Sequence, residues 1–146
     1  MNKNLAEKVF PAYMKNLDII CPPVEAKKEK IEVYRICKTG KIEERSFLPT
    51  YIEYEEKGTL TFLDLNDVGA YSLSCYEKKR DARNKLIFFT KKTPKPIAAV
   101  GITSPDCGVV MRTKERKRTR DSHVDWWLYE NSTPWKYFRE ANVLLR

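Results

Sequence analysis

The sequence predicts a single α+β domain, in which a mixed or antiparallel sheet of about six short strands packs with three to four helices. β-rich runs alternate with segments whose apolar residues recur every three or four positions. The length of 146 residues suits one domain, residues 1–146, and we find no internal repeat. Aromatic residues make up 12% of the chain, enough large side chains to build a core.

The first half of the chain is predicted to hold a helix, a hairpin and a second helix. Residues 3–20 space their apolar side chains as on one buried helical face, and a Pro-Pro pair follows. Residues 31–37 are β-rich, and the Lys-Thr-Gly turn after them predicts a hairpin returning along 41–45. Ser46 is predicted to cap a short helix that Gly58 ends.

The middle of the chain is predicted to alternate strands with one helix. Residues 59–65 and 69–74 have the composition of strands. The sequence Ser-Cys-Tyr-Glu at 74–77 matches a capping box, which predicts a helix over residues 75–90. The continuous apolar run 96–102 is predicted to be a central buried strand.

The last third is predicted to contain two strands and a closing helix. Residues 109–113 form the first strand, and residues 123–129 form the second. Thr133 and Pro134 have the pattern of a helix start. In the second strand, alternation places Val124, Trp126 and Leu128 on an apolar face, and His123, Asp125, Trp127 and Tyr129 on a half-exposed or site-lining face.

The positive charge is concentrated in the second half of the chain. Residues 1–77 contain 11 Lys/Arg and 13 Asp/Glu, whereas residues 78–146 contain 17 Lys/Arg and 7 Asp/Glu. The net charge is +7 over residues 78–95 and +5 over residues 112–120. We refer to these as the first and second basic segments. Such asymmetry indicates an anionic partner: nucleic acid, an acidic protein or a phosphate-bearing ligand.

The leading hypothesis is a small non-enzymatic protein that contacts nucleic acid or a nucleoprotein complex through phosphates. Trp127 is predicted to stack on a base. The sequence shows no helix-turn-helix, RNA-recognition or zinc-finger signature, so sequence-specific readout is not implied. The predicted phosphate-binding residues are Lys78, Lys79, Arg80, Arg83, Arg112, Lys114, Arg116, Lys117, Arg118 and Arg120.

Two other interpretations compete with this one. The second basic segment could be a solvated loop. Alternatively, the protein could dock on an acidic partner and modulate a larger machine, as accessory proteins of mobile elements do. His123 and Asp125 share a strand face, an arrangement typical either of a general base or of a surface histidine beside an acid.

The composition also bears on compartment and cofactors. The cysteines at 21, 37, 75 and 107 form no CxxC pair, which disfavours a zinc site and a disulfide framework. The sequence contains no run of 18 apolar residues and no signal-peptide pattern at its N-terminus, so we expect a cytoplasmic protein without a metal or other cofactor.

One pattern runs across the whole chain. Arg35 lies on an early strand, Ser72-Leu-Ser74 ends a later strand, and Glu130 follows a strand near the C-terminus. This order resembles the Arg…Ser-x-Ser…Glu order of ADP-ribosyltransferases, although Leu73 replaces their usual Thr and Leu128 stands where their second acidic residue or Gln would be. The resemblance implies an NAD-dependent enzyme in which Arg35 contacts the dinucleotide, Ser72 and Ser74 order the site, and Glu130 supports transfer.

Overall fold

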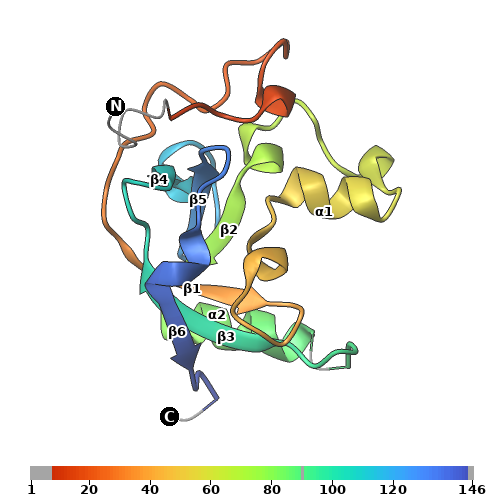
Figure 1. Ribbon diagram of the computed structural model, residues 1–146, viewed down its shortest axis with the longest axis vertical. Coiled ribbons are helices and arrows are strands. Elements are labelled where there is room, and N and C mark those ends of the chain that lie inside the picture. Colours follow the sequence, from red (N-terminus) through yellow and green to blue (C-terminus); the bar gives the residue numbers. More distant parts are fainter. Residues whose placement is uncertain (1–7, 90, 145–146) are drawn as a thin grey trace, which may run out of the picture.

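A six-stranded antiparallel sheet forms the centre of the protein, in the strand order β4-β5-β2-β1-β3-β6 (Figure 1). The computed structural model describes residues 8–89 and 91–144. The strands are β1 (Glu32–Cys37), β2 (Leu73–Tyr76), β3 (Ile97–Ile102), β4 (Gly108–Arg112), β5 (His123–Leu128) and β6 (Phe138–Ala141). The α+β class, the antiparallel pairing and the six strands agree with the sequence prediction.

The described residues contain two α-helices, fewer than the three to four that the sequence predicts. In Figure 1, α1 (Thr50–Glu56) stands to the right of the sheet, and α2 (Lys79–Phe88) lies behind β1 and β3. Gly58 follows α1 with φ of +68°, a conformation in which glycine ends helices readily, as predicted. The other helical segments are short 3-10 turns: Ala12–Met14, Glu44–Phe47, Leu60–Phe62, Val68–Tyr71, Thr113–Glu115 and Pro134–Tyr137.

Alternation along β5 divides the core between the two faces of the sheet. Val124, Trp126 and Leu128 join one buried cluster, as predicted. Trp127 joins a second cluster on the opposite face. The helix α2 contributes Ala82 and Leu86 to a third cluster, which follows from the three-to-four spacing of its apolar residues. The second face of β5 was predicted to be half-exposed, but Asp125, Trp127 and Tyr129 on that face are buried.

The predicted helix over residues 3–20 is wrong in its described part, and residues 1–7 lie outside the described residues. A single 3-10 turn, Ala12–Met14, occupies this segment. Its large side chains instead pack one by one on tertiary partners: the Phe10 ring lies 4.9 Å from the Tyr129 ring. Pro11 lacks the N–H that a helix would use, so these contacts prevail over the helical pattern.

The hairpin returning along residues 41–45 is also wrong. The strand β1 pairs with β2 on one edge and with β3 on the other, which leaves no edge for a returning strand. Residues 59–65 form a 3-10 turn with an exposed Phe62 instead of a strand. Long-range pairing of β1 therefore overrode local β propensity in residues 41–45.

Three predicted helix starts do not begin an α-helix in the structure. Ser74 lies within β2 opposite Asp125, and α2 begins five residues later at Lys79. Ser46 is buried and hydrogen-bonded to the Thr39 hydroxyl, whereas α1 begins after Pro49. The segment after Pro134 makes only one 3-10 turn before β6 begins. In each case, strand pairing or packing in the core determines the conformation of a residue whose local pattern favours a helix.

A buried arginine connects β1 to the segments beside it. Arg35 is only 4% exposed. Its Nε donates to the carbonyl of Ser46 over 2.9 Å, and its Nη1 donates to the carbonyl of Ser74 over 3.0 Å. Its Nη2 also lies 3.5 Å from a carboxylate oxygen of Glu53 on α1. One guanidinium therefore holds β1, β2, the Ser46 turn and α1 together.

We expect Arg35→Ala to lower the free energy of unfolding by about 3–5 kcal/mol, because it leaves buried carbonyl acceptors without their donor and removes one of the two cations beside the Glu53 carboxylate. The matched control is Arg45→Ala, since Arg45 forms an exposed ion pair with Glu56 and should cost at most about 1 kcal/mol. Urea denaturation measures both values. Equal losses for the two variants would contradict the structural role of Arg35.

Candidate functional site

A cavity of about 660 Å³ opens where β1 and β2 meet α1 and α2. Among the described residues, β1 and β2 share only the register pair Tyr34 and Tyr76, so the two strands diverge and leave room between them. We call this hollow the aromatic cavity. Its walls contain Arg35, Ile36, Lys38, Thr50, Glu53, Tyr54, Lys57, Thr59, Phe62, Ser74, Tyr76, Lys85, Phe88, Phe89 and His123.

Aromatic rings and cations together line the aromatic cavity. Phe62 is 81% exposed and Phe88 is 74% exposed, although both line the cavity. The Lys85 ammonium lies 5.7 Å from the centre of the Phe88 ring. Lys38 and Lys57 add positive charge. Exposed rings beside cations can stack on a flat heterocycle while the cations hold an anion.

Glu53 is the acidic side chain in the wall of the aromatic cavity. Its carboxylate accepts from the Lys38 ammonium over 3.1 Å and also faces Arg35. Burial lowers the pKa of Lys38, while the neighbouring Glu53 raises it and Arg35 lowers it. Glu53 therefore positions two cations of the cavity and balances part of their charge.

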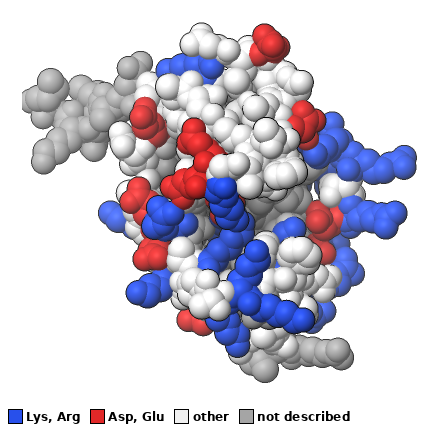
Figure 2. Space-filling model, turned by 90° about the vertical axis from the view of Figure 1, so that its right-hand side faces the viewer, with Lys and Arg blue, Asp and Glu red and all other residues white. Residues whose placement is uncertain are grey.

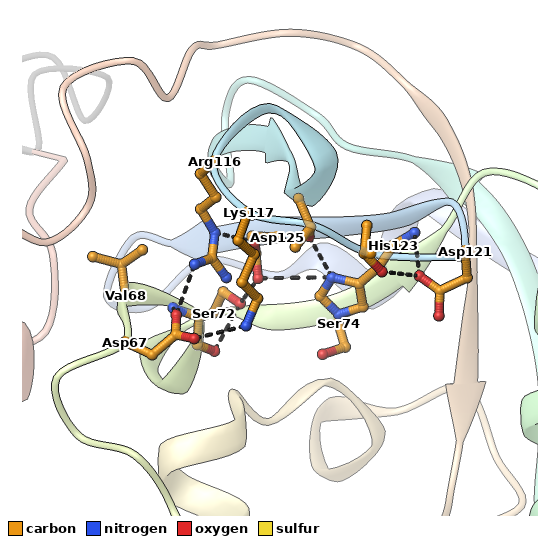
Figure 3. Close-up of polar contacts among 12 residues, drawn as sticks. Asp67, Val68, Ser72, Ser74, Arg116, Lys117, Asp121, His123 and Asp125 are labelled. Carbon is orange, nitrogen blue, oxygen red and sulfur yellow. Dashed lines mark hydrogen bonds and ion pairs between the residues drawn. The ribbon is translucent and has the colours of Figure 1, made fainter.

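The carboxylate of Asp125 on β5 lies beside this cavity and is fully buried. It accepts hydrogen bonds from Ser72 Oγ over 2.7 Å, from Thr113 Oγ1 over 2.8 Å and from Arg116 Nε over 2.8 Å. These donors come from the start of β2, the end of β4 and the second basic segment (Figure 3). Three donors satisfy a charge that burial would otherwise make costly.

Carboxylates of the fold bind several cations of the second basic segment. Figure 3 shows Arg116 and Lys117 reaching toward Asp67, and each forms an ion pair of 2.7 Å with it. Arg112 pairs with Glu77 over 2.7 Å. These three cations were predicted to bind phosphates, but each has a carboxylate partner within the fold.

His123 has a defined hydrogen-bonding state. The Thr113 hydroxyl donates its one proton to Asp125, so its oxygen accepts from His123 Nδ1–H. This arrangement leaves a lone pair on Nε2. Burial lowers the pKa of His123, and although Asp125 and Asp121 oppose the shift, the net direction is downward. The imidazole is therefore neutral near pH 7 and can accept a proton at Nε2.

A second hollow, of about 440 Å³, has His123 in its wall as well. It is lined by cations of both basic segments: Lys78, Arg80, Arg112, Lys114 and Arg120. Ser122 joins the segments, since its hydroxyl donates to Asp81 and accepts from the Lys78 N–H. We call this hollow the basic depression. The two basic segments thus meet on one face, which the sequence could not show.

The carboxylates in the basic depression already have donors within the protein. Asp81 accepts from the N–H and hydroxyl of Ser122, Asp121 accepts from Thr119 and from the His123 N–H, and Glu77 accepts from Arg112. Lys114 and Arg120 are exposed cations. Figure 2 faces the side of the molecule on which α1 stands in Figure 1, and Lys and Arg are gathered over its middle, lower part and right edge. Arg80 and Arg112 are paired with Asp81 and Glu77, so an anion in the basic depression would meet mainly the charges of Lys78, Lys114 and Arg120.

The remaining predicted site residues fall into separate places. Lys79 and Arg118 are exposed, and Arg83 is half-buried. The prediction that Trp127 stacks on a base is wrong, because its ring is fully buried and its Nε1 donates to the carbonyl of Val68. Glu130 is exposed and is absent from the wall of the aromatic cavity, which His123 lines instead.

Sequence reasoning missed several residues of the aromatic cavity, among them Phe62, Phe88, Lys38 and Glu53. One signal was available for Phe88: adjacent phenylalanines at the end of an amphipathic helix cannot both face the core.

Cys107 is buried, and burial raises the pKa of its thiol, so it is a poor nucleophile.

We expect Asp67→Asn to remove a pH-dependent part of the stability. Burial raises the pKa of Asp67, but hydrogen bonds from Lys117 and the Gly69 N–H, together with the charge of Arg116, outweigh it and lower the pKa to about 2. Because the folded pKa is depressed, this stabilisation is present above about pH 4 and is lost as the pH falls towards 2.

Denaturation at pH 6 and at pH 2.5 measures this effect. The loss of stability caused by Asp67→Asn should be up to about 2 kcal/mol at pH 6 and should shrink at pH 2.5. Asp18→Asn, which removes an exposed carboxylate, serves as the control. A loss of the same size at both pH values would show that the ion pairs of Asp67 do not stabilise the fold.

No family model matches the chain, and neither the curated proteins nor the solved structures contain a match. Within residues 8–89 and 91–144, no group of three or more His, Cys, Asp or Glu side chains is placed to hold a metal ion. No helix in the same residues is long and apolar enough to cross a membrane. The functional proposal therefore rests on the residues of the two hollows.

Proposed function

We propose that this protein is an ADP-ribosyltransferase-like enzyme that binds NAD in the aromatic cavity. One observation carries the proposal: Arg35 and Ser74, two residues of the sequence resemblance, line this cavity together with His123. Arg35 and Ser74 are 39 residues apart in the chain, yet the Arg35 guanidinium donates to the Ser74 carbonyl. Two of the four residues that carry the resemblance therefore share the wall of one hollow, whereas Ser72 and Glu130 lie outside that wall.

The aromatic cavity has the size and chemistry that a dinucleotide requires. Its volume of about 660 Å³ lies within the range of small-molecule and cofactor sites. NAD contains two flat heterocycles and a pyrophosphate. The exposed rings of Phe62 and Phe88 can stack on heterocycles, and Lys38, Lys57 and Lys85 can neutralise the pyrophosphate.

In the resemblance, Glu130 supports the transfer step, and this role needs another residue. Glu130 is not part of the cavity wall, so we assign its role to His123. Its neutral imidazole presents Nε2 as an acceptor, because Nδ1–H is bonded to Thr113. The resemblance implies that NAD donates its ADP-ribose group to an acceptor. His123 would take the proton that the acceptor loses, and Arg35 and Glu53 would keep the cavity wall in place.

We expect the double variant Phe62→Ala and Phe88→Ala to bind NAD at least about tenfold more weakly than the wild type, because removal of each stacking ring costs about 1–3 kcal/mol. Both rings are exposed, so the fold should persist. Isothermal titration calorimetry measures the affinity. The control Ile20→Ala and Val24→Ala removes two exposed apolar side chains outside the cavity and should bind NAD normally.

We expect His123→Gln to slow the release of nicotinamide from NAD by about 10²–10⁴-fold, the usual contribution of a general base. Since the pKa of His123 is lowered, the wild-type rate should fall only below the ordinary histidine range, and this acid limb should vanish in the variant. Liquid chromatography of nicotinamide measures the rate. An unchanged rate would exclude His123 as the base, and absence of NAD binding would exclude the enzyme.

A second candidate function, nucleic-acid binding, is supported by the basic depression. Four cations from two separate segments surround it: Lys78, Arg80, Lys114 and Arg120. Arg112, Arg116 and Lys117 are less suited to phosphates than the sequence suggested, because carboxylates already bind them. An acidic protein remains the competing partner for the same surface.

We expect wild-type protein to bind a single-stranded oligonucleotide in a salt-dependent manner. The double variant Lys114→Ala and Arg120→Ala should flatten the log–log salt slope by about 1.4, or about 0.7 for each phosphate that the protein no longer neutralises. The matched control Lys136→Ala and Arg139→Ala removes two exposed cations near the opposite sheet edge. Fluorescence anisotropy measures the slopes. Equal slopes for the two double variants would exclude the basic depression as the binding surface.

A further inference from the structure

We infer that the acceptor of the ADP-ribose group is a nucleic acid held in the basic depression. This inference rests on the proposed function. Its starting point is the position of His123, whose side chain is 19% exposed and lines both hollows. A donor in the aromatic cavity and an acceptor in the basic depression would therefore meet at one imidazole.

The order of the chain around His123 explains this shared wall. Ser122 and Asp121 lie in the wall of the basic depression, and the next residue, His123, begins β5. On the adjacent strand, Tyr76 pairs with His123 in register and lies in the wall of the aromatic cavity. His123, the first residue of β5, thus contributes to the walls of both hollows.

The charges of the basic depression favour a nucleic acid. Its five cations exceed its three carboxylates, and those carboxylates accept hydrogen bonds from the protein itself. The cations come from the N-terminal end of α2 and from the loop before β5, so they surround the depression instead of converging on one point. A chain of phosphates fits such a distribution, and the exposed guanidinium of Arg120 can bind phosphate through two N–H groups.

The reaction balances without a further reactant. The bond between C1′ of the ribose and the nicotinamide nitrogen breaks, and nicotinamide leaves with the electron pair. C1′ then bonds to a proton-bearing nitrogen or hydroxyl of the nucleic acid. The proton of that group moves to Nε2 of His123 and from there to solvent, which regenerates the neutral imidazole.

The test supplies NAD, labelled in its adenylate phosphate, to the full chain together with single-stranded RNA, single-stranded DNA or duplex DNA. A polyglutamate peptide serves as the acidic-protein arm. Label on an oligonucleotide, accompanied by an equal amount of nicotinamide, is the expected result. The preferred oligonucleotide identifies the acceptor, and label confined to the peptide or to the protein itself would overturn the inference while leaving the enzyme proposal intact.

The variants separate the acceptor site from the NAD site. For Lys114→Ala and Arg120→Ala, the ratio of label on nucleic acid to free ADP-ribose should fall at least tenfold, because water replaces the weakly held acceptor. Lys136→Ala and Arg139→Ala should leave this ratio unchanged. An unchanged ratio in the first pair would overturn the inference. No nicotinamide release by wild type would overturn the proposed function and the inference with it.

Discussion

The buried carboxylate of Asp125 is the interaction on which the arrangement of the site depends. A charge without solvent must be paired, and removal of a partner from such a buried pair typically costs about 3–5 kcal/mol. Asp125 meets this requirement with Ser72, Thr113 and Arg116, which come from three different parts of the chain. The same interactions hold the second basic segment against the sheet and determine which nitrogen of His123 carries the proton.

This constraint divides the basic residues into two groups with different roles. Arg112, Arg116 and Lys117 neutralise carboxylates and shape the loop before β5. Lys78, Arg80, Lys114 and Arg120 surround the basic depression. The cations that neutralise carboxylates hold the loop before β5 in place. They thereby position the cations of the basic depression beside His123. Net charge alone cannot make this distinction, because both groups contribute equally to the excess of cations in residues 78–146.

The fold and the site differ in how far the sequence predicted them. The strands near residues 31–37, 96–102, 109–113 and 123–129 were predicted, since β-rich composition, a continuous apolar run or alternation is a local signal of a strand. The capping box at Ser74 and the helical spacing of residues 3–20 misled, because backbone pairing with β5 and aromatic contacts with Tyr129 and Tyr51 prevailed. Of the four residues in the resemblance, Arg35 and Ser74 line the aromatic cavity, Ser72 instead binds Asp125, and Glu130 lies outside the cavity wall. The exposed rings of the aromatic cavity were not predicted.

The sequence by itself determined the α+β class, the concentration of positive charge in the second half and the faces of β5, because composition and the two-residue period of strands are local properties. The tertiary structure alone decided that the two basic segments meet at Ser122, that Trp127 is buried, and that His123 stands between two hollows. These outcomes depend on which strands pair and on where buried charges find donors, and such interactions join residues too distant in the chain for local patterns to reveal.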